Sequence, residues 1–345
     1  IFNTRSSYEI PPDYVTVSER MKALGYYCAA PMIGADSTYG GALRGYDRLV
    51  STGWKLPAWE ACERAIGHME AFGETDLFLF LHVTDVHPYD AKDFKFSTTV
   101  EALLPIEERL FQWNQPTASV RLPDDKIYQQ QYWSGIRRID RSIGFLLSYI
   151  EEHYAENDYI VNLYSDHGVS IFTRSADGQA DIIGENATCA AWMMRGAGVP
   201  QGIISDELTS IVDIYPVLGH LCGFPVDSAI DGNLPAVFGG HEREAVYTMS
   251  IFPGQTYKLA VRNRTHSLRI QTKEPLNEEG TADFSEAISV IYPRGYEAQT
   301  GYEVDSPELR AFFYPRARQM VHELANNGEH WPSMRAAHAD WFGEK

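Results

Sequence analysis

The sequence has little positive charge, no closely spaced cysteines and no long apolar run. Its 345 residues contain 29 Lys and Arg against 47 Asp and Glu, so the net charge is −18. A chain this acidic is repelled by phosphate groups, and we expect neither nucleic acid nor an anionic membrane surface as a partner. The longest apolar candidate, residues 77–83, has the length of a strand. It falls well short of the roughly 20 residues of a membrane span, so no membrane segment is predicted.

The four cysteines, Cys28, Cys62, Cys189 and Cys222, are far apart and form no C-x-x-C pair. This spacing predicts free thiols, mostly buried, rather than a metal or redox centre. Hydrophobic residues make up 44% of the chain and charged residues 22%, which is ordinary globular usage and excludes a disordered, collagen-like or repeat protein. The length suits one large α/β unit or two domains. The excess of carboxylates also suits a cation site.

Helical patterns alternate with apolar strands along the first two thirds of the chain. Two of the apolar runs, 76–83 and 159–164, are nearly continuous, as in strands buried on both faces of a parallel sheet. This order predicts an open α/β sheet with helices on both faces. We expect helices over 17–24, 57–72, 129–153 and 208–222, and strands over 26–32, 76–83, 159–164 and 188–195.

After about residue 240 the pattern changes to short alternating strands joined by turns. Strands are expected over 245–250, 257–262 and 267–272, with a helix over 307–326 to cover them. The sequence therefore predicts two parts, an α/β domain over 1–240 and an antiparallel α+β subdomain over 241–345. The polar stretch 91–124 is expected to be a long loop that faces the substrate.

The strongest local motif is Ser165-Asp166-His167-Gly168, directly after the predicted strand 159–164. Ligands of open α/β sheets bind beyond the carboxyl ends of the strands. Adjacent Asp and His side chains there can offer an oxygen and a nitrogen to one divalent cation, and Gly168 allows the backbone to turn sharply. The alternative is a capped turn with no ligand.

A second loop, Thr84-Asp85-Val86-His87-Pro88-Tyr89, follows the predicted strand 76–83. His87 is a candidate to bind a substrate oxyanion or to donate a proton, because the pKa of histidine lies near neutral pH. Asp85 is expected either to orient His87 or to cap the loop. His82, inside the strand, is interpreted as a core or sheet-edge histidine.

These two loops and the helix between them resemble the sulfatase branch of the alkaline-phosphatase-like superfamily. In that family the helix reads Y-x-x-G-I-x-x-x-D-x-x-I-G-x-L-L, which residues 132–147 match. Downstream, 185–202 resembles the segment E-x-x-x-x-x-P-x-x-x-x-x-P-G-V-x-x-G, and 212–218 resembles V-D-I-x-P-T-L. Upstream, 17–26 resembles T-L-x-x-x-L-K-x-x-G-Y. The resemblance runs from about residue 15 to 270 and depends on many weak motifs in the right order.

The resemblance implies an α/β/α sandwich around a mostly parallel sheet, with a smaller antiparallel sheet and helix at the C-terminal end. It implies that Asp166 and His167 bind the catalytic divalent cation and that His87 contacts the sulfate or the leaving-group oxygen. Calcium is the first expectation for the metal, with manganese, magnesium and zinc as alternatives because imidazole suits softer metals. The implied substrate is a small sulfated organic molecule, a carbohydrate being one option.

The sequence also departs from the family pattern. In sulfatases the first strand ends in an Asp-Asp pair, and a nucleophile segment C/S-x-P-x-R follows, whose Cys or Ser becomes formylglycine. Residues 1–14 contain neither feature, and none of the four cysteines has that context. We therefore expect the nucleophile, and with it formylglycine, in a segment that precedes Ile1. We also expect this chain alone to bind metal poorly and to hydrolyse no sulfate ester, which turnover of a chromogenic aryl sulfate would contradict.

Many relatives place a lysine after S-D-H-G, but no Lys occurs between Val169 and Glu185. Arg174 is the candidate that replaces it in binding the sulfate, and His266 is a second candidate. Lys258 and Arg262 lie in the same predicted sheet as His266, where a solvated surface is the alternative role.

Three functions remain open at this point. The first is a sulfatase-type hydrolase of sulfate esters, and the second is a phosphoryl transferase or phosphodiesterase of the same superfamily with a Thr or Ser nucleophile. The third is a non-catalytic homologue that acts as a binding or structural module.

Overall fold

The computed structural model describes most of the chain. The described residues are 13–32, 43–51, 56–83, 85–86, 126–168, 182–251, 255–277, 281–326 and 335–337. His87, Arg174 and the stretch 91–124 lie outside them, so the predictions for these residues are not addressed by the structure.

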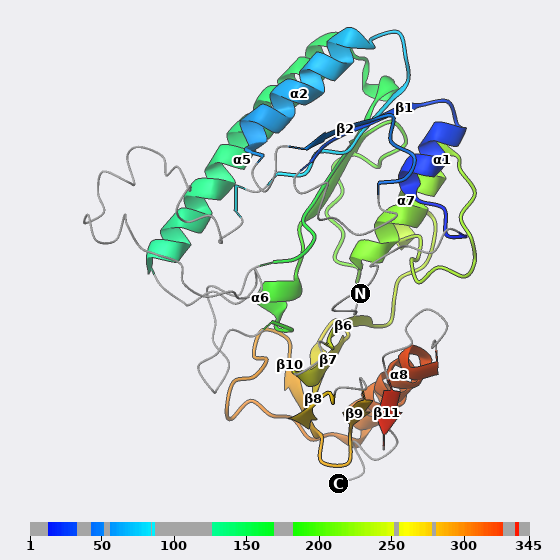
Figure 1. Cartoon of the computed structure of the whole chain (residues 1–345). Helices are drawn as coiled ribbons and strands as arrows, with labels where there is room; N and C mark the ends of the chain where they lie inside the picture. Colours follow the sequence, from blue (N-terminus) through cyan, green and yellow to red (C-terminus); the bar gives the residue numbers. More distant parts are fainter. Residues whose placement is uncertain are drawn as a thin grey trace.

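A parallel sheet with helices on both faces forms the first part of the fold (Figure 1). The described strands β1 (Tyr27–Met32), β2 (Arg48–Ser51) and β3 (Leu77–Leu79) pair in the order β2-β1-β3, all parallel. This arrangement confirms the predicted α/β class.

Side-chain alternation in β3 assigns the two helical layers. Leu77 and Leu79 pack with one buried cluster, and Phe78 packs with another. The first cluster involves α2 (Ala58–Ala71) and α5 (Lys126–His153), which lie side by side. The second involves α1 (Val17–Ala23) and α7 (Ile214–Cys222). Because alternate residues of a strand point to opposite faces, the helices cover both faces of the sheet.

The strand predicted over 76–83 is shorter and less buried than expected. Regular strand pairing extends only over β3, yet Phe80 and His82 still donate backbone hydrogen bonds to Ala29 and Pro31 of β1, at 3.0 and 3.1 Å. Residues 77–83 are half-buried. Within the described residues β3 is paired along one edge, to β1, and its two faces are covered by helices but only partly buried.

The strand β4 (Ile160–Tyr164) pairs antiparallel with β5 (Trp192–Gly196). Val161 of β4 packs against the α2 and α5 cluster, so β4 shares a helical layer with β3. Its residues are half-buried, less than a strand covered on both faces requires. The strand predicted over 188–195 begins at Trp192, and Thr188 is instead the last residue of a short helix, α6 (Glu185–Thr188).

A separate antiparallel sheet forms the C-terminal part. The described strands β6 (Val246–Ser250), β7 (Thr256–Arg262), β8 (His266–Pro275) and β10 (Ile288–Pro293) pair in the order β10-β8-β7-β6. The helix α8 (Pro307–Asn326) covers it, and its Phe313, Ala317 and Val321 are fully buried against the sheet. The predicted antiparallel sheet with a covering helix is confirmed, whereas the division of domains at residue 240 stays a prediction.

Short elements complete the described fold. The strands β9 (Thr281–Asp283) and β11 (Arg335–Ala337) pair parallel beside α8. Single 3-10 turns are η2 (Glu156–Asp158), η3 (Ile211–Asp213) and η4 (Ala236–Phe238). In the part of the chain that the structure describes, no helix combines the length and apolar character needed to cross a bilayer.

Candidate functional site

The S-D-H-G loop lies at the carboxyl end of β4, where the sequence predicts it. Three hydrogen bonds fasten it to the chain that leads into β5. Ser165 donates its amide to the Ala191 carbonyl at 3.0 Å, and Ala191 donates its amide to the Ser165 hydroxyl at 2.9 Å. Gly168 donates its amide to the Ala187 carbonyl at 2.9 Å. The loop is therefore held at both ends.

Gly168 is required for close approach rather than for an unusual backbone conformation. A Cβ at this position would lie 2.2 Å from the Asn186 carbonyl oxygen. Real side chains do not tolerate such a distance, so any other residue would displace either the loop or α6. The sequence predicts a sharp turn at Gly168, and the structure supplies a different reason for the glycine.

Asp166 and His167 present their polar atoms to one region at the surface. The Asp166 side chain is 75% exposed and that of His167 36%, with 3.6 Å between Asp166 Oδ2 and His167 Nε2. His167 donates its amide to Asp166 Oδ1 at 3.0 Å. Its Nδ1 lies 2.7 Å from the Gly168 carbonyl oxygen. Because a carbonyl only accepts hydrogen bonds, Nδ1 carries the proton, and the lone pair of neutral His167 is on Nε2.

This geometry suits two ligands of one cation. Two atoms bound about 2.1 Å from a tetrahedral ion lie about 3.4 Å apart, close to the 3.6 Å observed. A carboxylate with an imidazole is a donor set for zinc or manganese, whereas calcium prefers oxygen ligands alone. Among the described residues, no three His, Cys, Asp or Glu side chains gather as a complete metal site. The metal-binding role of the pair therefore stays a prediction.

His82 lies near the same region, which the sequence does not reveal. Its imidazole is half-buried at the end of the ladder between β1 and β3. Burial lowers the pKa of His82, and the negative charge of Asp166 opposes that shift. The Asp166 charge therefore acts on His82, which lies three residues beyond the end of β3. The one signal in the sequence is that His82 and Asp166 each lie at the end of a predicted apolar strand.

Asp85 fixes the second predicted loop to two helices. Its Oδ2 accepts the amide of Ala58, the first residue of α2, at 2.6 Å, and its Oδ1 accepts Arg138 Nε of α5 at 3.2 Å. The Asp85 side chain is 5% exposed. A Cβ at Gly135 would lie 2.4 Å from the Asp85 carbonyl oxygen, so α5 packs directly on this loop. These contacts favour the capping role, while the role of His87 stays a prediction.

The predicted basic candidates of the small sheet differ in their surroundings. Arg262 is buried and forms a two-pronged ion pair with Glu297, with Nε–Oε1 at 2.5 Å and Nη2–Oε2 at 2.7 Å. The expectation of a solvated surface or substrate role is therefore wrong for Arg262, because burial of its charge requires this permanent partner. His266 contacts its own turn, with Nδ1 2.9 Å from Thr265 Oγ1. Its role in binding substrate stays a prediction.

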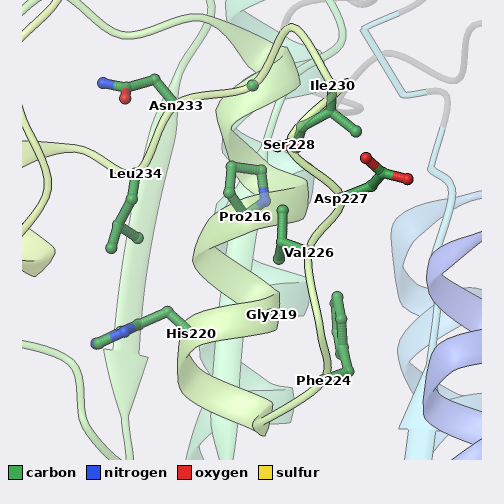
Figure 2. Close-up of a pocket in the computed structure, with 11 residues that line it drawn as sticks. Pro216, Gly219, His220, Phe224, Val226, Asp227, Ser228, Ile230, Asn233 and Leu234 are labelled. Atoms are coloured by element: carbon green, nitrogen blue, oxygen red, sulfur yellow. The ribbon is translucent and has the colours of Figure 1, made fainter.

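A hollow of about 390 Å³ lies beside α7 (Figure 2). Its polar lining includes His220 on α7 and Asp227 and Asn233 on the segment that follows. In Figure 2 the side chains of Asn233 and Asp227 extend in different directions and do not converge on one point. The hollow shares no residue with the predicted site, so it does not extend that site.

Comparison with known proteins supports the relationship that the motifs indicate. The chain matches the curated N-acetylgalactosamine-6-sulfatase of Canis lupus familiaris at 29% identity over 123 residues. The match covers 32% of this chain and 24% of the relative, about a quarter of its length. No protein-family model matches the chain.

Solved structures with the same fold include two in complex with sugars and a GAG sulfatase. BT4656, solved in complex with its substrate D-glucosamine-2-N,6-O-disulfate, has a TM-score of 0.60 at 13% identity. The comparison covers 93% of this chain and 84% of that one. BT1596, a 2-O GAG sulfatase, has a TM-score of 0.59 at 14% identity, with 95% of this chain and 79% of that one covered.

Ps i-CgsB, solved in complex with k-i-k-neocarrahexaose, has a TM-score of 0.59 at 14% identity. The comparison covers 98% of this chain and 80% of that one. At these identities the structures establish the fold, and the curated relative establishes the homology. The chain thus has homology to a sulfatase over 123 residues and shares the fold of the solved sulfatase structures.

Proposed function

We propose that this chain belongs to a sulfatase that hydrolyses the sulfate ester of a small organic molecule, a sulfated sugar in particular. The observation that carries the proposal is the Asp166–His167 pair, with 3.6 Å between its two ligand atoms at the carboxyl end of β4. The sugar ligands of two structures with the same fold support the substrate class.

The predicted site residues would bind the cation, contact the sulfate and bind the rest of the substrate. Asp166 and His167 would hold a divalent cation, which polarises the sulfate oxygens when bound. His87 would contact the sulfate or give a proton to the leaving-group oxygen, and Arg174 and His266 would bind the charged substrate. The 345 residues contain no C/S-x-P-x-R segment, so none of them is assigned as the nucleophile.

Ester specificity tests the proposal directly. The natural full-length protein is assayed with 4-nitrophenyl sulfate, 4-nitrophenyl phosphate and a sulfated glucosamine. We expect sulfate release from the sugar and the aryl sulfate and at most slow release of phosphate. A preference for the phosphate ester would instead identify a phosphoryl transferase or phosphodiesterase, and no turnover of any ester would favour a binding or structural module.

Substitution of one metal ligand locates the chemistry. We expect Asp166→Asn to lower kcat/KM for the sulfate ester by at least about 100-fold, because even outer-shell partners of a metal cost 10–100-fold. Asp158→Asn is the matched control, since Asp158 is an exposed carboxylate at the opposite end of β4. It is expected to keep wild-type activity. Equal activity of wild type and Asp166→Asn would contradict the assigned site.

The metal itself is identified by removal and replacement. Chelation is expected to abolish sulfate ester hydrolysis, and the protein is then given calcium, manganese, magnesium or zinc singly. Calcium remains the first expectation from the family, whereas the imidazole of His167 favours manganese or zinc. Full activity after exhaustive chelation would contradict the cation site.

A further inference from the structure

The C-terminal sheet reaches across to the segment that supports the S-D-H-G loop. Arg262 of β7 donates from Nη2 to the Ile183 carbonyl oxygen, while its ion pair with Glu297 and a 3.2 Å hydrogen bond from Nη1 to Thr248 Oγ1 hold it in place. The Arg262 and Glu297 side chains are each 4% exposed. Ile183 itself is 2% exposed. This contact is therefore built into the interior of the protein rather than formed on its surface.

A second contact lies two residues farther along the same segment. Glu185, the first residue of α6, accepts hydrogen bonds from Arg294 Nε at one oxygen and from the Gly295 amide, at 2.7 Å, at the other. Arg294 also donates from Nη1 to the Asn263 carbonyl at 3.0 Å, so the guanidinium is anchored to the turn between β7 and β8. Both oxygens of Glu185 are thus bound by groups at the end of β10.

Gly168 of the S-D-H-G loop contacts this same segment, residues 183–187. The Ala187 carbonyl, two residues after Glu185, accepts the Gly168 amide at 2.9 Å, and the Asn186 carbonyl leaves no room for a Cβ at Gly168. Gly168 in turn accepts the Nδ1 proton of His167 at 2.7 Å. A continuous series of contacts therefore runs from Arg294 through Glu185 and α6 to the His167 ring.

We propose that Arg294 is a positioning residue, which acts through Glu185 and α6 to hold the S-D-H-G loop so that Asp166 and His167 face one cation. The cation part of this inference rests on the proposed function. A purely structural ion pair would raise stability without affecting the loop. A positioning residue additionally controls the order of the loop and the affinity of its metal ligands.

The test uses the natural full-length protein with Arg294→Gln and Glu185→Gln, singly and together. The readouts are hydrogen exchange of the peptide that contains residues 165–168, and the Mn²⁺ and Ca²⁺ concentrations that give half-saturation. We expect faster exchange at Gly168 and about a tenfold higher half-saturation in each single variant, as for other outer-shell partners. The double variant should match the single variants, because both residues act through one contact. Arg294→Lys should recover part of the loss.

Arg243→Gln is the matched control. Arg243 also joins the beginning of the C-terminal part to the first part, through Asp213, but its contacts do not include the segment 183–187. It is expected to lower stability and leave Gly168 exchange and cation half-saturation unchanged. Wild-type values of both readouts in Arg294→Gln and Glu185→Gln would overturn the inference, as would equal changes in Arg243→Gln. Failure of the wild type to bind either cation would contradict the proposed function. The hydrogen exchange of Gly168 would still test whether Arg294 and Glu185 hold the loop in place.

Discussion

The hydrogen bond from His167 to the Gly168 carbonyl is a residue-scale feature that no motif reveals. The motif S-D-H-G identifies Asp166 and His167 as candidate ligands, but which ring nitrogen holds the proton depends on a carbonyl 2.7 Å away. The exposure of each cysteine thiol is likewise a feature that the sequence alone does not reveal. Two of the four cysteines are buried as predicted, Cys222 is intermediate, and Cys189 is exposed. The spacing of cysteines indicates free thiols, whereas the exposure of each depends on its tertiary neighbours.

Thiol reactivity follows from these surroundings. Burial raises the pKa of both Cys28 and Cys62 to about 11. The thiolate is the reactive form, so at pH 8 only about one in a thousand of these thiols is ionised, and both are also covered. We expect iodoacetamide to label Cys189 well before Cys28 and Cys62, as measured by peptide mass spectrometry over time. In urea all four should react, and native labelling of Cys28 as fast as Cys189 would contradict this packing.

Elements whose boundaries depend on their own sequence are predicted well, and those bounded by distant partners are not. The helix α8 begins and ends at the expected residues, 307 and 326, and β6 and β7 differ by one residue from expectation. The helix expected from 208 instead begins after Asp213. A local capping box between Ser210 and Asp213 begins this segment as the turn η3, and the Arg243 guanidinium also binds the Asp213 carboxylate. Arg243 is 30 residues away, beyond the reach of a local pattern.

The junction between α1 and β2 offers an element-scale prediction with a matched control. Gly45 and Gly25 both have positive φ, +87° and +97°. A Cβ on Gly45 would lie 2.4 Å from the Glu19 amide nitrogen, whereas a Cβ on Gly25 would meet nothing within 4 Å. Gly25→Ala should therefore cost about 1 kcal/mol, the strain of the left-handed conformation alone.

Gly45→Ala must in addition displace the backbone of α1, where the capping box between Thr16 and Glu19 begins the helix. We expect a total loss of about 3 kcal/mol or more in the free energy of unfolding. Urea unfolding monitored by circular dichroism measures both variants. Equal losses would mean that α1 moves freely relative to β2, contrary to the packing described.

At the scale of the whole molecule, two ion pairs and a buried hydrogen bond join the parts that the sequence predicts separately. The Glu185 and Arg262 contacts reach from the first part of the chain to the antiparallel sheet, and Asp213 with Arg243 joins α7 to the segment before β6. The sequence predicts both parts of the fold, because local patterns specify each. It does not indicate these contacts, since their partners are 30 to 109 residues apart.

Substitution of Asp213 tests whether its contact with Arg243 joins the α/β part to the antiparallel sheet. Its side chain is 1% exposed and accepts four hydrogen-bond donors, from the Ser210 and Asn233 amides at 2.7 Å each and from two nitrogens of Arg243. Asp213→Asn removes the charge that balances Arg243 and replaces one acceptor oxygen by a donor. We expect it to lower the free energy of unfolding by about 3 kcal/mol or more, the usual loss when one member of a buried pair is removed.

Asp227→Asn is the matched control, because Asp227 is exposed and its contact is a local 2.8 Å hydrogen bond from the Ala229 amide. It should change the unfolding free energy by no more than about 0.5 kcal/mol. Urea unfolding is monitored by tryptophan fluorescence, and hydrogen exchange of β6 and α7 shows where the structure loosens. If Asp213 joins the two parts, exchange rises on both sides of the junction in Asp213→Asn. A loss confined to α7 would show that the antiparallel sheet is held by the Glu185 and Arg262 contacts alone.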